Sequence, residues 1–178
     1  MADVANPQVS LTLGPIGFRV HPFAAVTSVR CFKQDQAFGA EFKWLFGVSP
    51  PEIGAAVPLQ GDSEIMAVWS RPTEILFVAP NTAPDIDPTR VFGSNVGYVT
   101  DLDGQYALLR CDGPRVPSML SRLGGGNTCP SRGQAKRARL ADAPAMVFSS
   151  LTDQYTIMID RSVLEHFIAY ATQVCSNL

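Results

Sequence analysis

The chain has 178 residues, of which 46% are hydrophobic and only 17% charged, and its formal net charge at pH 7 is −2. This composition excludes a disordered chain and argues against a general nucleic-acid binder, which is usually strongly basic. Because a soluble protein with so few charges often hides part of its surface, the composition also suggests a partner protein.

The sequence carries no signal for a membrane or for secretion. No apolar run approaches the ~20 residues that a spanning helix needs, and the first residues lack the basic start and apolar core of a signal peptide. The 4 cysteines form no Cys-x-x-Cys pair and the chain has only 2 histidines, so a zinc site cannot be drawn at normal spacing. We therefore expect a cytoplasmic protein with free thiols.

The first half of the chain predicts an N-terminal arm followed by four strands and two helices. Residues 1–24 are interrupted by Pro and Gly residues and predict an extended arm. Asp35 and Gly47 stand where a helix would begin and end, around apolar residues at helical spacing. The other elements predicted in this half are strands over 26–32, 65–70, 74–79 and 98–102 and a short helix near 86–92.

The second half predicts four more strands and two more helices. Asp103-Gly104 is a strong turn signal, and Pro114 suits the first turn of a helix. Ser162, with Glu165 three residues later, predicts a capping box at the start of the terminal helix, which runs to about Val174. The other elements predicted in this half are strands over 105–111, 135–140, 145–150 and 155–160 and a helix over 114–123.

The two halves share an order of elements, which predicts the fold class. Residues 25–102 and 105–175 would form pseudo-repeats within one α+β domain over 25–178. Each repeat would be a ferredoxin-like βαββ unit, with an antiparallel sheet and its helices packed on one face. A single larger mixed sheet is the alternative interpretation of the same element order.

Residues with catalytic chemistry are scarce. The sequence has no G-x-G-x-x-G or G-x-x-x-x-G-K-[ST] loop. His21 and His166 have no orienting partner nearby in sequence, so a structural role is favoured for both. The acidic pairs Asp85/Asp87 and Asp101/Asp103 are typical of turns. We therefore expect no catalytic, cofactor-binding or metal-binding residue in this chain.

Basic residues are concentrated in one stretch. Residues 110–139 hold half of the 14 basic residues and a single acidic residue, Asp112. Such a stretch is either a solvated run of charge or a contact to an acidic partner surface. The tryptophan at the end of strand 65–70 is a further candidate for an interface. The interface candidates are Trp69, Arg132, Lys136, Arg137 and Arg139.

Several segments together resemble a known family. Residues 69–80, W-S-R-P-T-E-I-L-F-V-A-P, resemble the W-x-x-P-x-E/D-x-L-L-x-x-P hairpin of the gamma subunit of heterotetrameric sarcosine oxidase. Residues 99–114, with Asp101 and the final Gly113-Pro114, are similar to that family's V-x-D…G-P segment. The strand 155–162, which ends in Arg-Ser before a terminal helix, also resembles the family.

This resemblance implies a fold like the folate-binding domains of the aminomethyltransferase (glycine-cleavage T-protein) superfamily. It also implies a non-catalytic subunit that binds no cofactor itself. FAD, FMN, NAD and tetrahydrofolate would be carried by larger flavin- and folate-domain-bearing partner subunits. The complex would demethylate sarcosine, or another N-methyl amino acid, and pass the one-carbon unit to tetrahydrofolate.

Two alternatives remain open at this point. The first is a stand-alone folate-binding or aminomethyltransferase-like protein, which would need an acidic residue to meet the pterin. Asp101 and Glu74 are the candidates for that residue. The second is an iron–sulfur assembly factor that uses Cys129, although the Cys129 to Gly133-Gln134 spacing departs from that branch's K-G-C-Y-x-G-Q-E motif.

Overall fold

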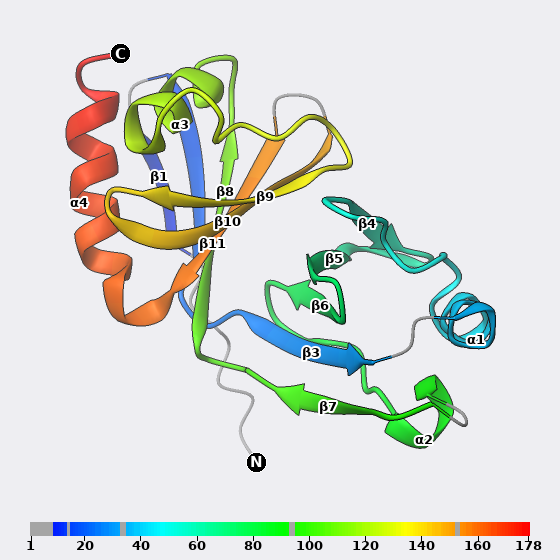
Figure 1. Ribbon diagram of the computed structural model, residues 1–178. Coiled ribbons are helices and arrows are strands. Elements are labelled where there is room, and N and C mark those ends of the chain that lie inside the picture. The colour runs from blue at the N-terminus through cyan, green and yellow to red at the C-terminus, as the bar shows by residue number, and fades with distance from the viewer. Residues whose placement is uncertain (1–8, 14, 33–34, 93–94, 152–153) are drawn as a thin grey trace.

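The computed structural model describes residues 9–13, 15–32, 35–92, 95–151 and 154–178, which form two antiparallel sheets (Figure 1). The six-stranded sheet has the order β1-β2-β8-β11-β10-β9, and the five-stranded sheet has the order β4-β5-β6-β3-β7. The strands of the six-stranded sheet are β1 (Val9–Leu13), β2 (Ile16–His21), β8 (Tyr106–Asp112), β9 (Ala135–Leu140), β10 (Ala143–Leu151) and β11 (Gln154–Asp160). Those of the five-stranded sheet are β3 (Ala25–Cys31), β4 (Ala56–Leu59), β5 (Asp62–Arg71), β6 (Glu74–Ala79) and β7 (Gly97–Asp101). The helices are α1 (Gln36–Phe46), α2 (Pro88–Phe92), α3 (Val116–Gly124) and α4 (Leu164–Cys175), and a 3-10 turn, η1 (Arg161–Val163), precedes α4.

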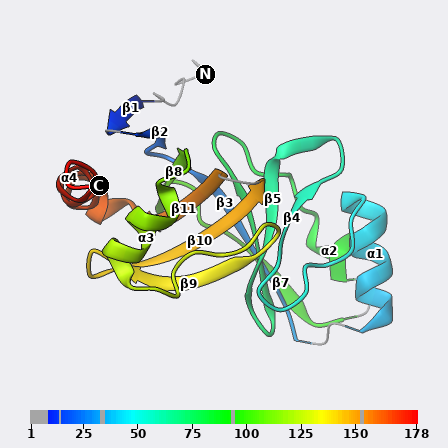
Figure 2. The same ribbon diagram turned by 90° about the horizontal axis from the view of Figure 1, so that it is seen from above.

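The two sheets pack face to face, and helices cover their outer faces (Figures 1 and 2). Helices α1 and α2 pack on the five-stranded sheet through a core that includes Phe42 and Phe77. Helices α3 and α4 pack on the six-stranded sheet around Leu120 and Phe167. A third core, with Met66 and residues of both sheets, fills the space between the sheets. The molecule is therefore a four-layer α/β/β/α sandwich.

Helix α1 shows how the sequence sets its own ends. The Asp35 carboxylate accepts a hydrogen bond from the Phe38 N–H at 3.1 Å, which satisfies one of the free donors of the first turn. Gly47 ends the helix in the left-handed region, with φ 73°, where a glycine carries no steric penalty. Phe38 and Phe42 lie one turn apart and are both buried. The predicted helix and both of its ends are confirmed.

The predicted pair of ferredoxin-like units is also confirmed. In the first unit, β3 leads to α1, then to β4, β5 and β6, and α2 leads to β7 beside β3. In the second unit, β8 leads to α3, then to β9, β10 and β11, and then to α4. The orders β4-β5-β6-β3-β7 and β9-β10-β11-β8-β2 correspond strand by strand. The place that β7 holds beside β3 in the first unit is thus taken in the second unit by β2, from the N-terminal segment.

The structure refines the prediction for the N-terminal segment. Residues 1–8 of the arm predicted over 1–24 lie outside the described residues. The described part is extended, as expected, but it forms the paired strands β1 and β2, in register from Val9↔Val20 to Leu13↔Ile16. Ile16, Phe18 and Val20 lie at alternate positions on one face of β2 and are buried in the helix-covered core. This burial explains why the segment joins the sheet.

Three local features of the structure were either not predicted or predicted wrongly. Strand β4 lies between the helix that ends at Gly47 and the predicted strand 65–70, where no strand was predicted. The hairpin β9–β10 turns through Ala141 and Asp142, both with positive φ, a type I′ arrangement that does not carry the usual Asn-Gly signal. The capping box at Ser162 and Glu165 is wrong, because the Asp160 carboxylate accepts the Ser162 N–H and begins a 3-10 turn instead.

Cys111, Cys129 and Cys175 are free thiols, and Cys111 and Cys175 are buried. Burial raises the pKa of both thiols, so they stay protonated and unreactive. Among the described residues, no helix combines the length and apolar character that crossing a bilayer would require.

Candidate functional site

Glu74, the first residue of strand β6, has a buried carboxylate that is the centre of a polar cluster. All six residues of β6 are buried. Residues on alternate positions share a face, so Glu74 points to the same side as Leu76 and Val78, which belong to the core between the sheets. A carboxylate in this position must find hydrogen-bond donors, because an isolated buried charge is very costly.

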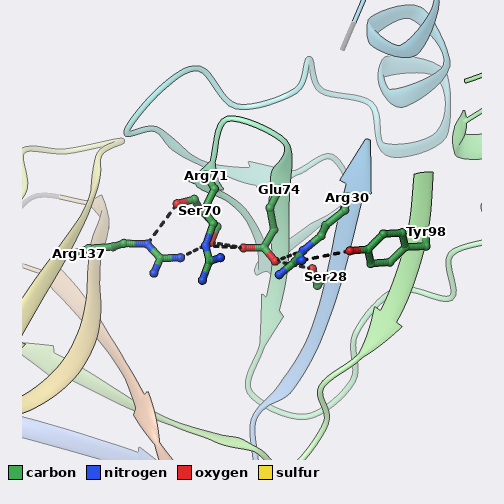
Figure 3. A network of polar contacts seen from close by, with 7 residues as sticks. All are labelled: Ser28, Arg30, Ser70, Arg71, Glu74, Tyr98 and Arg137. Atoms are coloured by element: carbon green, nitrogen blue, oxygen red, sulfur yellow. Dashed lines mark hydrogen bonds and ion pairs between the residues drawn. The ribbon is translucent and has the colours of Figure 1, made fainter. Parts of the chain in front are cut away.

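Four side chains supply those donors (Figure 3). One oxygen of Glu74 accepts from Ser28 Oγ at 3.0 Å and from Arg30 Nε at 2.7 Å. The other accepts from Ser70 Oγ at 2.7 Å and lies 3.5 Å from Arg71 Nε. Burial alone would raise the pKa of Glu74, but the hydrogen bonds from Ser70, Arg30 and Ser28 lower it overall. Glu74 is therefore an ionised structural group.

The cluster extends from Glu74 to both sides (Figure 3). Arg30 Nη1 donates to the Tyr98 hydroxyl on β7 at 3.1 Å. On the other side, Arg137 of β9 donates to the Ser70 hydroxyl at 2.6 Å and to its carbonyl at 3.2 Å. Ser70 lies on β5 of the five-stranded sheet and Arg137 on β9 of the six-stranded sheet, so these hydrogen bonds connect the two sheets.

Beyond Tyr98 lies an exposed apolar surface, here called the β7-edge patch and formed by Phe32, Val96 and Tyr98. Their exposed fractions are 61%, 73% and 44%. The Phe32 N–H donates to the Val96 carbonyl at 3.2 Å, and the rings of Phe32 and Tyr98 are 6.1 Å apart. Strand β7 is an edge strand, paired only with β3 among the described strands. Exposed aromatics beside an open edge and an arginine are typical of an interaction surface.

The predicted interface residues are distributed over several surfaces. Arg137 is part of the Glu74 cluster, whereas Lys136 points to the opposite face of β9 and donates to Asn127 Oδ1 and to the Cys129 carbonyl, both at 3.1 Å. Arg139 donates to the Asp142 carbonyl at 2.5 Å. Arg132 lines a cavity between the sheets, and Trp69 is half-buried on β5. Their role in an interface stays a prediction.

The residues considered for other chemistry have local structural roles. Asp101 accepts the Asp103 N–H at 2.7 Å, and Asp103 accepts the Val26 N–H at 2.7 Å, so both shape the turn between β7 and β8. Cys129 is half-buried against the core around α3. Within the described ranges, no three His, Cys, Asp or Glu residues come together as a metal site.

His21 is buried at the end of β2, and its Nε2 has no hydrogen-bond partner among the described residues. Burial, with Arg110 and Arg19 nearby, lowers the pKa of His21, and Glu64 opposes this effect only in part. When the pKa of a histidine is lowered in the folded protein, the folded state is favoured at any pH above the ordinary histidine pKa of 6.5. This contribution to stability is lost as the pH falls below 6.5 towards the lower pKa of the folded state.

We therefore expect the free energy of unfolding to fall by up to about 1.4 kcal/mol per pH unit below that value. Urea unfolding at about pH 7.5 and about pH 5.5 measures this slope. In a His21→Gln variant the slope should be smaller. The control is His166→Gln, because His166 is exposed. A slope that is equal in wild type and His21→Gln would contradict the assignment.

Comparison with known proteins identifies the fold. No protein-family model and no curated protein sequence matches the chain. A structure of heterotetrameric sarcosine oxidase from Corynebacterium sp. U-96 is similar, with a TM-score of 0.73 and 19% identity over 94% of this chain and 87% of that chain. Aminomethyltransferase T of the glycine cleavage system from Bartonella henselae is similar with a TM-score of 0.65 and 16% identity. That match covers 90% of this chain but 46% of the transferase, so this chain spans about half of its length. The chain has the aminomethyltransferase-like fold.

Proposed function

We propose that this chain, on its aminomethyltransferase-like fold, is a non-catalytic, gamma-type subunit of a multisubunit, flavin-dependent sarcosine oxidase or related N-methyl amino acid dehydrogenase. Larger cytoplasmic partner subunits would carry FAD, FMN, NAD and the tetrahydrofolate site. The complex would demethylate an N-methyl amino acid and pass the one-carbon unit to tetrahydrofolate. This chain would pack on those partners and stabilise them.

The observation that carries the proposal is the extent of the structural match. The similarity to the sarcosine oxidase chain includes 94% of this chain and 87% of that one, so the two chains have nearly the same length and the same fold throughout. The aminomethyltransferase T match leaves more than half of that protein uncovered. This pattern favours a small subunit of an assembly over a stand-alone transferase.

The surface of the molecule supports the same proposal. The β7-edge patch exposes two aromatic rings and a valine, which a partner subunit would bury. Tyr98 is held by Arg30, and Arg30 by the buried Glu74, so the patch is fixed in place before any partner binds. Such preorganisation lowers the entropic cost of association.

Co-purification tests the proposal directly. The full chain is co-expressed with flavoprotein subunits encoded by neighbouring genes, and the oxidation of sarcosine and other N-methyl amino acids is measured on the purified product. We expect all subunits to elute together and to oxidise an N-methyl amine. A soluble monomer with no affinity for those subunits would contradict the proposal.

The β7-edge patch gives a sharper prediction. Tyr98→Ser or Phe32→Ser should each weaken assembly about 30-fold, because aromatic residues at the centre of an interface commonly contribute about 2 kcal/mol or more. Biolayer interferometry against the purified partner measures the loss. The matched control is Tyr170→Ser on α4, which removes a tyrosine of similar exposure, 43%. Equal affinities for the Tyr98 and Tyr170 variants would exclude the patch from the interface.

Calorimetry separates this role from a stand-alone folate-binding role. Asp101 and Glu74, the acids considered for contact with a pterin, are already hydrogen-bonded within the chain. We therefore expect no heat when tetrahydrofolate is titrated into the chain alone. Stoichiometric binding would favour the stand-alone alternative.

A further inference from the structure

A cavity of about 380 Å³ lies between the two sheets, at a different place from the Glu74 cluster. Its floor is apolar and is formed by buried residues of both sheets, among them Met66, Val78, Leu108 and Phe148. The volume is within the range of pockets that hold small organic molecules. The cavity shares no residue with the β7-edge patch or the Glu74 cluster.

Arginine side chains surround the mouth of this cavity. Arg19 on β2 and Arg110 on β8 are paired directly across the two strands, and Arg132 follows from the loop before β9. Like charges placed opposite each other on neighbouring strands destabilise a sheet. Arg110 is compensated, because its Nη1 donates to Glu64 Oε1 on the facing sheet at 2.7 Å. Arg19 and Arg132 have no hydrogen bond or ion pair to any residue that the structure describes.

The charges around the mouth leave an excess of one positive charge. Arg110 and Glu64 neutralise each other. Of the remaining described residues that line the cavity, Arg19 and Arg132 are cationic and Asp112 is anionic. A single carboxylate would balance this excess, and a guanidinium binds a carboxylate through two parallel hydrogen bonds. The apolar floor would suit the hydrocarbon part of the same molecule.

We propose that this cavity is a binding site for a small monocarboxylate with an apolar body. The carboxylate is held at the mouth by Arg19, and the hydrocarbon part contacts Leu108, Phe148 and Met66. This inference is independent of the proposed subunit role, because it concerns a site within the chain itself.

Titration of the full chain with simple probes tests the proposal. Benzoate and hexanoate provide the carboxylate and the apolar body, benzamide lacks the charge, and inorganic phosphate lacks the apolar part. Binding is measured by NMR, through chemical-shift changes at the amides of β8 and β10. We expect saturable shifts with benzoate or hexanoate below ~10 mM, and at least ~10-fold weaker binding of benzamide and of phosphate.

Variants assign the binding to the arginine. Arg19→Gln should weaken benzoate binding by ~10-fold or more, because a hydrogen bond to a charged group is lost. This variant should stay folded, since it removes a cation opposite Arg110. The control is Arg139→Gln, an exposed arginine that does not line the cavity. No saturable shifts with benzoate or hexanoate, phosphate binding as tight as benzoate binding, or equal affinities of the two variants would each overturn the proposal.

Discussion

Replacing Glu74 by alanine should destabilise the fold by about 3–5 kcal/mol, the range observed when one partner of a buried ion pair is removed. The side chain of Glu74 is only 7% exposed, and its loss leaves Arg30, Ser28 and Ser70 without their acceptor. Urea unfolding followed by circular dichroism gives the free energy of unfolding of each variant.

The matched control is Glu64→Ala. Glu64 also pairs with an arginine at 2.7 Å, but its side chain is 56% exposed. An exposed ion pair contributes about 0–1 kcal/mol, so this variant should unfold almost like the wild type. Similar losses in the Glu74 and Glu64 variants would contradict the structural role of Glu74.

Lowering the pH should also remove the stabilising contribution of Glu74. The pKa of Glu74 is lowered in the folded protein from its ordinary value of 4.5. Its contribution is therefore complete above that value and is lost as the pH falls through the lower, folded-state pKa. A Glu74→Gln variant should be less stable than the wild type at neutral pH and should lose less stability in acid. The pH range in which the Glu74 contribution is lost lies below the pH range for His21, so the two effects can be measured separately.

Replacing Phe42 by alanine should destabilise the fold by about 3–5 kcal/mol, the range for large aromatic residues in a core. Phe42 is fully buried and its ring lies 4.7 Å from that of Phe46 and 5.6 Å from that of Phe77. It therefore joins α1 to the outer face of β6. The cavity left by the missing ring cannot be filled by these stiff neighbours without movement of the helix.

Helix α1 offers its own control for this prediction. Trp44 lies two residues further on and is 66% exposed, with its ring under the guanidinium of Arg90 at 4.7 Å. Trp44→Ala should cost about 0.5–1 kcal/mol, the size of an exposed cation–π contact. Thermal and urea unfolding of both variants measure the difference. A Phe42→Ala variant as stable as Trp44→Ala would show that α1 contributes little to the core.

Signals within a few residues of each other were enough to predict the helix ends and the hairpins between adjacent strands. Asp35 and Gly47 determine the ends of α1 through their own side-chain and backbone chemistry. The apolar runs on either side of residues 71–73 form the hairpin β5–β6 because the two strands are adjacent in the chain. These elements were predicted because each depends on a few neighbouring residues.

Long-range pairing explains what the sequence did not predict. Strand β2 forms because β8, about 90 residues later, offers it an open edge, as in the pair Val20↔Leu109. The Glu74 cluster likewise joins residues from β3, β5, β6, β7 and β9. One signal in the sequence pointed to it, since a single acid stands at the head of the apolar run 75–79. The basic residues of 110–139 do not form one surface, because alternate residues of a strand, such as Lys136 and Arg137, point to opposite faces of the sheet.

The use of β2 as the strand beside β8 in the second unit has a consequence for biosynthesis. The ribosome makes β1 and β2 before the other described strands, yet β2 pairs only with β1 and β8 among the described strands. The five-stranded sheet consists entirely of residues 56–101 together with β3, so it can assemble as soon as β7 emerges. The N-terminal hairpin must wait until β8 has been translated. Strands β1 and β2 are thus synthesised before the five-stranded sheet but can be placed only after it, so the second unit is completed later than the first.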